Sequence, residues 1–385
     1  MRVNIYALAG LVLLAIANCV FSKPYIPASD HEILERLPYK SSDANQREIR
    51  KMSQALRETP DNAELAVELA RRHIEQGRAT SDPRFFGYAR AALSYWWEAN
   101  DAPIEILVLR ATLHQNQHRF DQALLDLNLA LGRAPQHSQA RLTKAVVLQV
   151  RGEFDAAMQE CRALGLRAEL IVTTTCIASV QSLSGDLAGS YARLTSMSQQ
   201  MPSQSPALRA WVLSYLADMA ARLGQWQAAE ARYREALAAD PSDAFLLGAY
   251  ADLLLDRKRP QEAAKLLQGQ ERADGLLLRL ALAQRATGDA KWQDSRDQLA
   301  ARFAAAKLRN DRVHLREEAR FTLHLLDQPI TALALAQENW TIQKEPADAR
   351  LVLEAARLAK QPQAAMAVRD WLGTKRLEDV GFSKV

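Results

Sequence analysis

The chain has 385 residues, of which 48% are hydrophobic and 24% are charged, and its formal net charge is +4. This balance is ordinary for a folded protein and excludes an intrinsically disordered chain. Glycine and proline are scarce, at 15 and 14 residues, which favours helices over turn-rich β structure. Acidic and basic residues are interspersed without a concentrated basic block, which argues against nucleic acid as a partner.

The first 22 residues have the pattern of a secretory signal peptide. Arg2 precedes an apolar run over residues 5–17, which is shorter than the roughly 20 residues of a membrane span. Val20 and Ser22 suit the positions before a cleavage site, whereas Cys19 stands in a sequence similar to a bacterial lipobox. We therefore expect an exported protein, most simply periplasmic, with lipidation of Cys19 or an uncleaved N-terminal anchor as alternatives. No other segment is long and apolar enough to span a membrane.

The rest of the chain divides into four parts. Residues 23–45 contain three prolines and are expected to form an extended leader with one short helical stretch. A repeat array is predicted over residues 46–290, and divergent helical repeats over residues 291–373. The tail, residues 374–385, is expected to be loose.

The clearest repeated unit runs from Ala210 to Pro241. Small, glycine and aromatic residues occur in it at fixed offsets, namely Ala217, Gly224, Trp226, Ala229, Tyr233 and Ala236. This unit resembles a tetratricopeptide repeat (TPR), a pair of antiparallel helices in about 34 residues. The small residues let the helices approach closely, and glycine ends the first helix where a left-handed residue is needed. The resemblance implies an all-α, right-handed α-solenoid of TPR-like helical hairpins.

The same frame recurs along the chain. Small residues equivalent to Ala217 stand at Ala111, Ala145, Ala178, Ala251 and Ala281. A first, irregular repeat follows Pro60, and the pattern weakens after Gly288. Eight or nine helical hairpins are therefore expected in all.

The resemblance also implies a contact between two cysteines. Cys161 falls at position 24 of one repeat and Cys176 at position 6 of the next, so the two thiols are expected to face each other across the junction of two hairpins. In an oxidising compartment such a pair forms a disulfide. The alternative is two small buried hydrophobic side chains.

In the TPR family, the first helices of successive repeats line a concave groove through positions 2, 5, 9, 12 and 13. Carried over, these offsets imply a polar lining with an acidic middle and one aromatic anchor, Trp211. The implied groove residues are Gln115, Asn116, Gln149, Ser179, Ser182, Trp211, Asp218, Arg222, Asp252, Asp256 and Arg285. Where the family's clamp for C-terminal carboxylates has Lys and Arg, this chain has Gln, Ser and Asp. The alternative is a face that is merely solvated.

No motif in the sequence indicates catalysis or a metal site. The best histidine cluster, His314 with Glu317 and Glu318, lacks the second histidine of a zinc-binding motif, and nucleophile and phosphate-binding motifs do not occur. We expect no enzyme activity, no metal and no cofactor. The expected function is an exported adaptor or scaffold that binds a protein segment in its concave groove. The alternatives are an accessory module that docks on an envelope enzyme or transport complex through its convex face or ends, and, third, a metal-handling protein.

Overall fold

The computed structural model describes residues 29, 44–80, 82–165, 168–199 and 205–384. The predicted signal peptide, Cys19 and most of the leader lie outside these residues. Residues 1–50 and 51–385 form two units, and helix α2 (Ala44–Glu58) spans the boundary between them. No helix in the described ranges has the length and apolar character of a membrane span.

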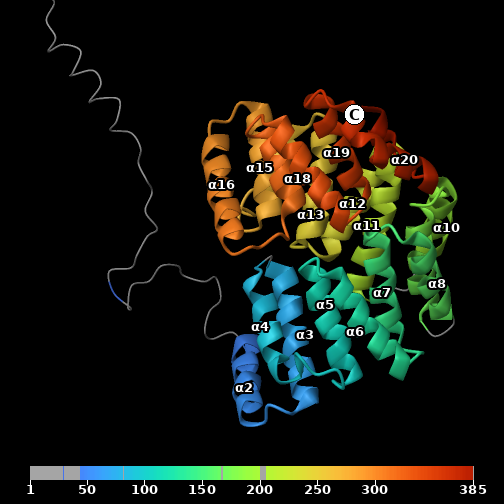
Figure 1. Ribbon diagram of the computed structural model, residues 1–385, viewed down its shortest axis with the longest axis vertical. Helices are drawn as coiled ribbons and strands as arrows, with labels where there is room; N and C mark the ends of the chain where they lie inside the picture. The colour runs from blue at the N-terminus through green and yellow to red at the C-terminus, as the bar shows by residue number, and fades with distance from the viewer. Residues whose placement is uncertain (1–28, 30–43, 81, 166–167, 200–204, 385) are drawn as a thin grey trace, which may run out of the picture. The chain divides into compact units, whose positions relative to one another are not determined.

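Nine helical hairpins follow one another through the described part of residues 63–375 (Figure 1). They pair α3 (Ala63–Thr80) with α4 (Arg84–Ala92), α5 (Ile104–Asn116) with α6 (Phe120–Arg133), α7 (Ser138–Val150) with α8 (Phe154–Leu164), α9 (Leu170–Gln181) with α10 (Leu187–Gln199), α11 (Pro206–Arg222) with α12 (Trp226–Ala239), α13 (Ala244–Asp256) with α14 (Pro260–Leu267), α15 (Asp274–Thr287) with α16 (Trp292–Leu308), α17 (Leu315–His324) with α18 (Pro329–Ile342), and α19 (Pro346–Leu358) with α20 (Met366–Lys375). The described residues contain no β-strand, and the predicted all-α solenoid is confirmed.

The first helix of each hairpin from α5 onward is followed by a residue with a left-handed backbone. These residues are His118, Gly152, Gly185, Gly224, Lys258, Gly288, Asp327 and Lys360. A left-handed residue reverses the chain and lets the next N–H bond back to the last turn of the helix. The N–H of Glu153, for example, donates to the carbonyl of Leu148 at 2.9 Å. The helix end predicted at Gly224 is confirmed.

Small residues hold the two helices of a hairpin together. Ala217 in α11, with Ala229 and Ala236 in α12, has no exposed surface, and Tyr233 is also buried. With only a methyl group at these positions the helix axes approach closely, and the larger side chains fill the remaining space. The hairpin over residues 206–239 is therefore built as the resemblance implied.

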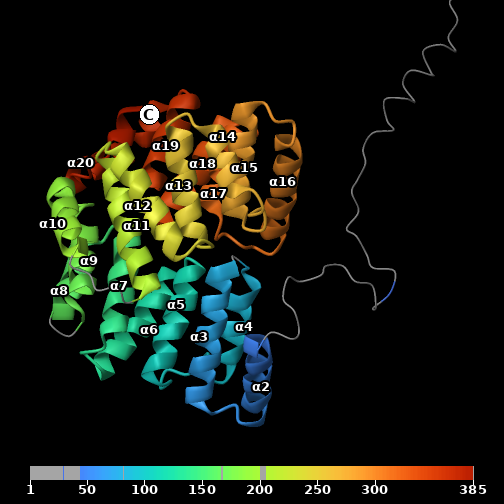
Figure 2. The same cartoon turned by 180° about the vertical axis from the view of Figure 1, so that it is seen from behind.

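The chain after α19 returns to earlier hairpins. Residues 366–384, which comprise α20 and a 3₁₀ helix (Val380–Lys384), are called the C-terminal strap here. In both views α20 lies beside α10 (Figures 1 and 2). Leu377 is 8% exposed and belongs to a core cluster with residues of α7, α8 and α9. The described part of the tail, residues 374–384, was expected to be loose and is instead packed against these hairpins through Leu377.

Candidate functional site

The residues of the predicted groove lie on, or directly after, the first helices α5, α7, α9, α11, α13 and α15. These helices are neighbours along the array, and their shared surface is called the first-helix face. Asn116 is exposed at the end of α5, and Gln115 beside it is half-buried. Ser179 and Ser182 are buried. The predicted residues therefore share one surface but differ in how accessible they are.

A row of interacting polar side chains crosses three successive first helices. The hydroxyl of Ser179 in α9 donates to Oε1 of Gln149 in α7 at 2.8 Å. The hydroxyl of Tyr215 in α11 interacts with both of these side chains. Burial raises the pKa of Tyr215 to about 12, so its hydroxyl stays protonated at neutral pH. Tyr215 was not among the predicted groove residues, because it stands at repeat position 6 and the groove of the TPR family is lined by positions 2, 5, 9, 12 and 13.

Arg222 ties two hairpins together. It is 5% exposed, and its guanidinium donates to the carbonyl and to the hydroxyl of Ser182, each at 2.8 Å. Its Nε also donates to the carboxylate of Asp218 at 2.9 Å. Asp218, whose side chain is 49% exposed, is the accessible member of the three. Arg222 and Ser182 thus serve the stacking of hairpins, whereas Asp218 faces solvent.

Two carboxylates of α13 are neutralised by arginines from later hairpins. Asp252 accepts from Arg279 of α15 at 2.6 Å and pairs with Arg320 of α17 at 2.7 Å. Burial raises the pKa of Asp252, but the two arginines outweigh it and lower this pKa to about 2. Asp256 accepts two hydrogen bonds, at 2.9 and 3.1 Å, from Arg350 of α19. The acidic middle predicted for the groove is therefore paired within the chain.

Trp211 and Arg285 lie at two other parts of the face. Trp211 is partly buried against the core of α11, and its ring meets that of Tyr215 edge-on with the centroids 5.6 Å apart. Arg285 donates to the carbonyl of His324 and, at 2.8 Å, to Asp327. Trp211 and Asp218 are seven residues apart on α11, so they lie on the same side of this helix two turns apart.

Cys161 of α8 and Cys176 of α9 form the disulfide that the resemblance implied. Their Cα atoms are 5.4 Å apart, and both side chains are buried in a core cluster. The bond fixes the junction between the hairpins α7–α8 and α9–α10.

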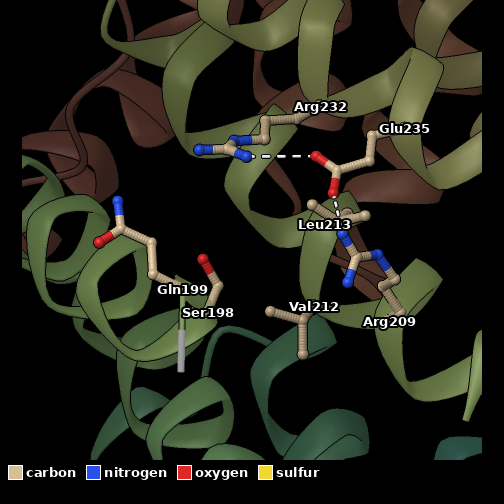
Figure 3. Close-up of a pocket in the computed structure, with 7 residues that line it drawn as sticks. All are labelled: Ser198, Gln199, Arg209, Val212, Leu213, Arg232 and Glu235. Carbon is tan, nitrogen blue, oxygen red and sulfur yellow. Dashed lines mark hydrogen bonds and ion pairs between the residues drawn. The ribbon is translucent and has the colours of Figure 1, made fainter. Parts of the chain in front are cut away.

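A hollow of about 230 Å³ lies among α10, α11 and α12 (Figure 3). It is lined by Ser198, Gln199, Arg209, Val212, Leu213, Arg232 and Glu235. Glu235 pairs with Arg209 and accepts from Arg232 at 3.2 Å, so the charged groups of this wall neutralise one another. None of the predicted groove residues is among its described lining.

The histidine cluster of the sequence lies at the start of α17. Glu318 of this cluster pairs with Lys307, and His314 immediately precedes the helix. Among the residues that the structure describes, no three His, Cys, Asp or Glu side chains are grouped to hold a metal ion.

No protein-family model and no curated protein matches the sequence. Among solved structures, human IFIT1, determined as a dimer with PPP-AAAA, has a TM-score of 0.49 and 12% identity over 85% of this chain and 78% of its own. A TPR protein from Parabacteroides merdae has a TM-score of 0.35 and 13% identity over 79% and 98%. The APC/C complex Cut9–Hcn1 has a TM-score of 0.40 and 14% identity over 86% and 84%.

The class of the protein rests on its own geometry. Successive helical hairpins recur with a left-handed residue after the first helix, and buried alanines stand at fixed offsets in them. These features define an all-α solenoid of TPR-like hairpins.

Proposed function

We propose that the protein is an exported, non-enzymatic scaffold that holds a segment of a protein partner on its first-helix face. The observation that carries this proposal is the surface of α11, where the half-buried Trp211 lies on the same side of the helix as the exposed carboxylate of Asp218. An aromatic anchor beside a charge on a rigid element is the arrangement of binding hot spots. Tyr215 between them packs edge-on against Trp211 and interacts with Gln149 and Ser179, which keeps the surface preorganised.

The charges of the face favour a protein segment over nucleic acid. Arg222, Arg279, Arg320 and Arg350 each pair with a carboxylate of the face itself. Binding to a phosphate backbone relies on cationic side chains that displace the counterions of the nucleic acid. Arginines that are already paired with carboxylates contribute less to this displacement. The accessible groups of the face suit a protein segment that packs an apolar residue against Trp211 and pairs a basic residue with Asp218.

Export is supported by the signal-peptide pattern of residues 1–22 and by the disulfide, since such bonds persist in oxidising compartments. Intact-mass measurement of the native protein tests this. A chain that begins near Lys23, or that carries lipid on Cys19, supports export. A cytoplasmic chain that retains Met1 and has free Cys161 and Cys176 contradicts it.

The first-helix face is tested by affinity capture from an envelope extract. The variant Trp211→Ala/Asp218→Lys should lose at least tenfold in recovery of a specific partner, with an unchanged helical circular dichroism spectrum. The control Tyr95→Ala/Asp297→Lys changes an exposed aromatic and an exposed acid elsewhere and should capture as wild type does. Equal recovery by all three proteins contradicts binding on this face and favours the alternative, docking through the convex face or the ends.

A further inference from the structure

The C-terminal strap crosses the turns of three successive hairpins, and each of these turns contains a glycine. Gly152, Gly185 and Gly224 have φ angles of 77°, 91° and 75°. A Cβ atom on these glycines would lie 2.7 Å from the ring of Trp371, 3.0 Å from Cβ of Arg376 and 3.6 Å from the methyl groups of Val380, respectively. Gly288 has a similar φ of 74°, but a Cβ there would meet nothing within 4 Å. The three turns thus form a track on which the strap lies.

Apolar side chains anchor the strap to this track. The ring of Trp371 meets Phe154 of α8 with the centroids 5.7 Å apart and Trp340 of α18 with the centroids 5.1 Å apart. Leu377 is buried in the same core cluster as Phe154 and the disulfide-bonded cysteines. The ammonium group of Lys375 lies 5.6 Å from the centroid of Phe154. A partly buried aromatic residue and a buried leucine, six residues apart, therefore carry the contact.

An acidic residue of the strap lies at the edge of the first-helix face. Asp379 interacts electrostatically with Arg350 of α19 and with Arg222 of α11. Its carboxylate accepts from the N–H of Gly381 at 2.6 Å, which fixes its orientation. Arg222 is the residue that holds Asp218, so the strap ends next to the surface proposed to bind a partner.

We propose that the C-terminal strap is an intramolecular ligand of the array, and that the track takes from a partner protein a segment of the same chemistry. That segment carries an aromatic residue, a leucine six residues later and an acidic residue two positions further, and it displaces the strap. The proposal rests on the proposed scaffold function and adds to it a second surface, the track, with a partner chemistry of its own. Occupancy of the track by this sequence, with Trp371 and Leu377 packed in it and Asp379 held by the N–H of Gly381, argues for such a segment.

The covalent link makes the strap a strong competitor. A segment tethered to its site is present at an effective concentration of roughly millimolar, so a free segment of equal intrinsic affinity binds far more weakly. A change that weakens the strap without altering the track should therefore expose the site. Leu377→Asp places a charge in the apolar cluster and releases the strap. Met366→Asp makes the same kind of change at an exposed position of α20 and serves as the matched control.

The test is binding of a fluorescently labelled peptide of residues 366–384 to the full chain, measured by anisotropy. The Leu377→Asp protein should bind the peptide at least ten times more tightly than wild type, and Met366→Asp should behave as wild type. A peptide with Asp379→Lys should bind the Leu377→Asp protein at least three times more weakly. Equal affinities of the Leu377→Asp and wild-type proteins, or no binding to either, would overturn the proposal.

Hydrogen exchange provides the second measurement. In Leu377→Asp the turns at Gly152, Gly185 and Gly224 should lose protection, and added peptide should restore it, while α13 and α15 stay unchanged. If Leu377→Asp loses helicity, Leu377→Ala takes its place and should bind the peptide at least three times more tightly than wild type; failure of this variant also overturns the proposal. Because the peptide is this chain's own sequence, the experiment can fail while partner capture through Trp211 succeeds, and the reverse.

Discussion

The indole ring of Trp371 occupies the space that a side chain on Gly152 would take, since a Cβ atom there would come within 2.7 Å of it. Gly152 serves two purposes at once. It adopts the left-handed conformation that ends α7, and it leaves room for a residue of the strap. The two requirements can be separated by experiment, because Gly288 also has a left-handed backbone but has no neighbouring side chain in the space that a Cβ atom would take.

Gly152→Ala should destabilise the protein more than Gly288→Ala. Both substitutions place an alanine at a left-handed position, at a cost of about 1–2 kcal/mol. Gly152→Ala also forces Trp371 out of place, which adds about 1–3 kcal/mol. The measurement is the free energy of unfolding in urea, followed by circular dichroism. In a Trp371→Ala background the difference between the two alanine variants should disappear; if the two variants lose equal stability in the wild-type background, the close packing of Trp371 is contradicted.

Reduction of the disulfide should lower stability while leaving the hairpins helical. Cys161 and Cys176 are 15 residues apart, and closing such a loop contributes about 3 kcal/mol in the chain-entropy model. Urea unfolding with and without reductant measures the loss, and the double variant Cys161→Ala/Cys176→Ala should respond to reductant by less than about 0.5 kcal/mol. An identical response of wild type and double variant would show that the disulfide does not contribute to the free energy of unfolding.

Asp252 should make stability depend on pH in the acidic range. Its pKa is lowered from 3.8 to about 2, so the stability it contributes is present above the unfolded value and is lost as the pH falls through the folded value. The difference in unfolding free energy between wild type and Asp252→Asn should be about 1 kcal/mol smaller at pH 3 than at pH 6. A constant difference over this range would contradict the pairing of Asp252 with Arg279 and Arg320.

Tyr215→Phe should cost about 0.5–1.5 kcal/mol, because it removes the hydroxyl that interacts with Gln149 and Ser179. The pKa of Tyr215 is raised from 10.0 to about 12, so its contribution is complete below pH 10 and is lost as the pH rises toward 12. Unfolding at pH 8 and pH 11 should therefore show a larger loss for wild type than for Tyr215→Phe. Tyr95→Phe, at an exposed ring, should match wild type at both values.

Much of the fold was predictable because TPR-like hairpins are local. Ala217, Ala229 and Gly224 lie within one hairpin, and their spacing indicates which helix faces meet and where the first helix ends. The left-handed turns at His118 and Lys258 gave no such signal, since nothing about histidine or lysine marks that conformation in a sequence. In those hairpins the packing of both helices, and not the turn residue, dictates the reversal.

The sequence predicted where the first-helix face lies, but not that its carboxylates are paired with arginines. Repeat offsets located Asp252 and Asp256 on one surface, yet their partners Arg320 and Arg350 come from hairpins much later in the chain. A repeat pattern describes neighbours and carries no information on such distant contacts. The strap was missed for the same reason, because its contact residues, Leu377 among them, follow no repeat.

The strap also bears on how the chain folds. A stack in which each hairpin touches only its neighbours folds from many starting points and unfolds from its ends. Contacts such as Trp371 with Phe154 join residues far apart in the chain, and loops of that length close late. We therefore expect the hairpins α7–α12 to form with their turn edge uncovered, and the strap to dock on them last. Once it is docked, the ends of the stack no longer unfold independently of its middle.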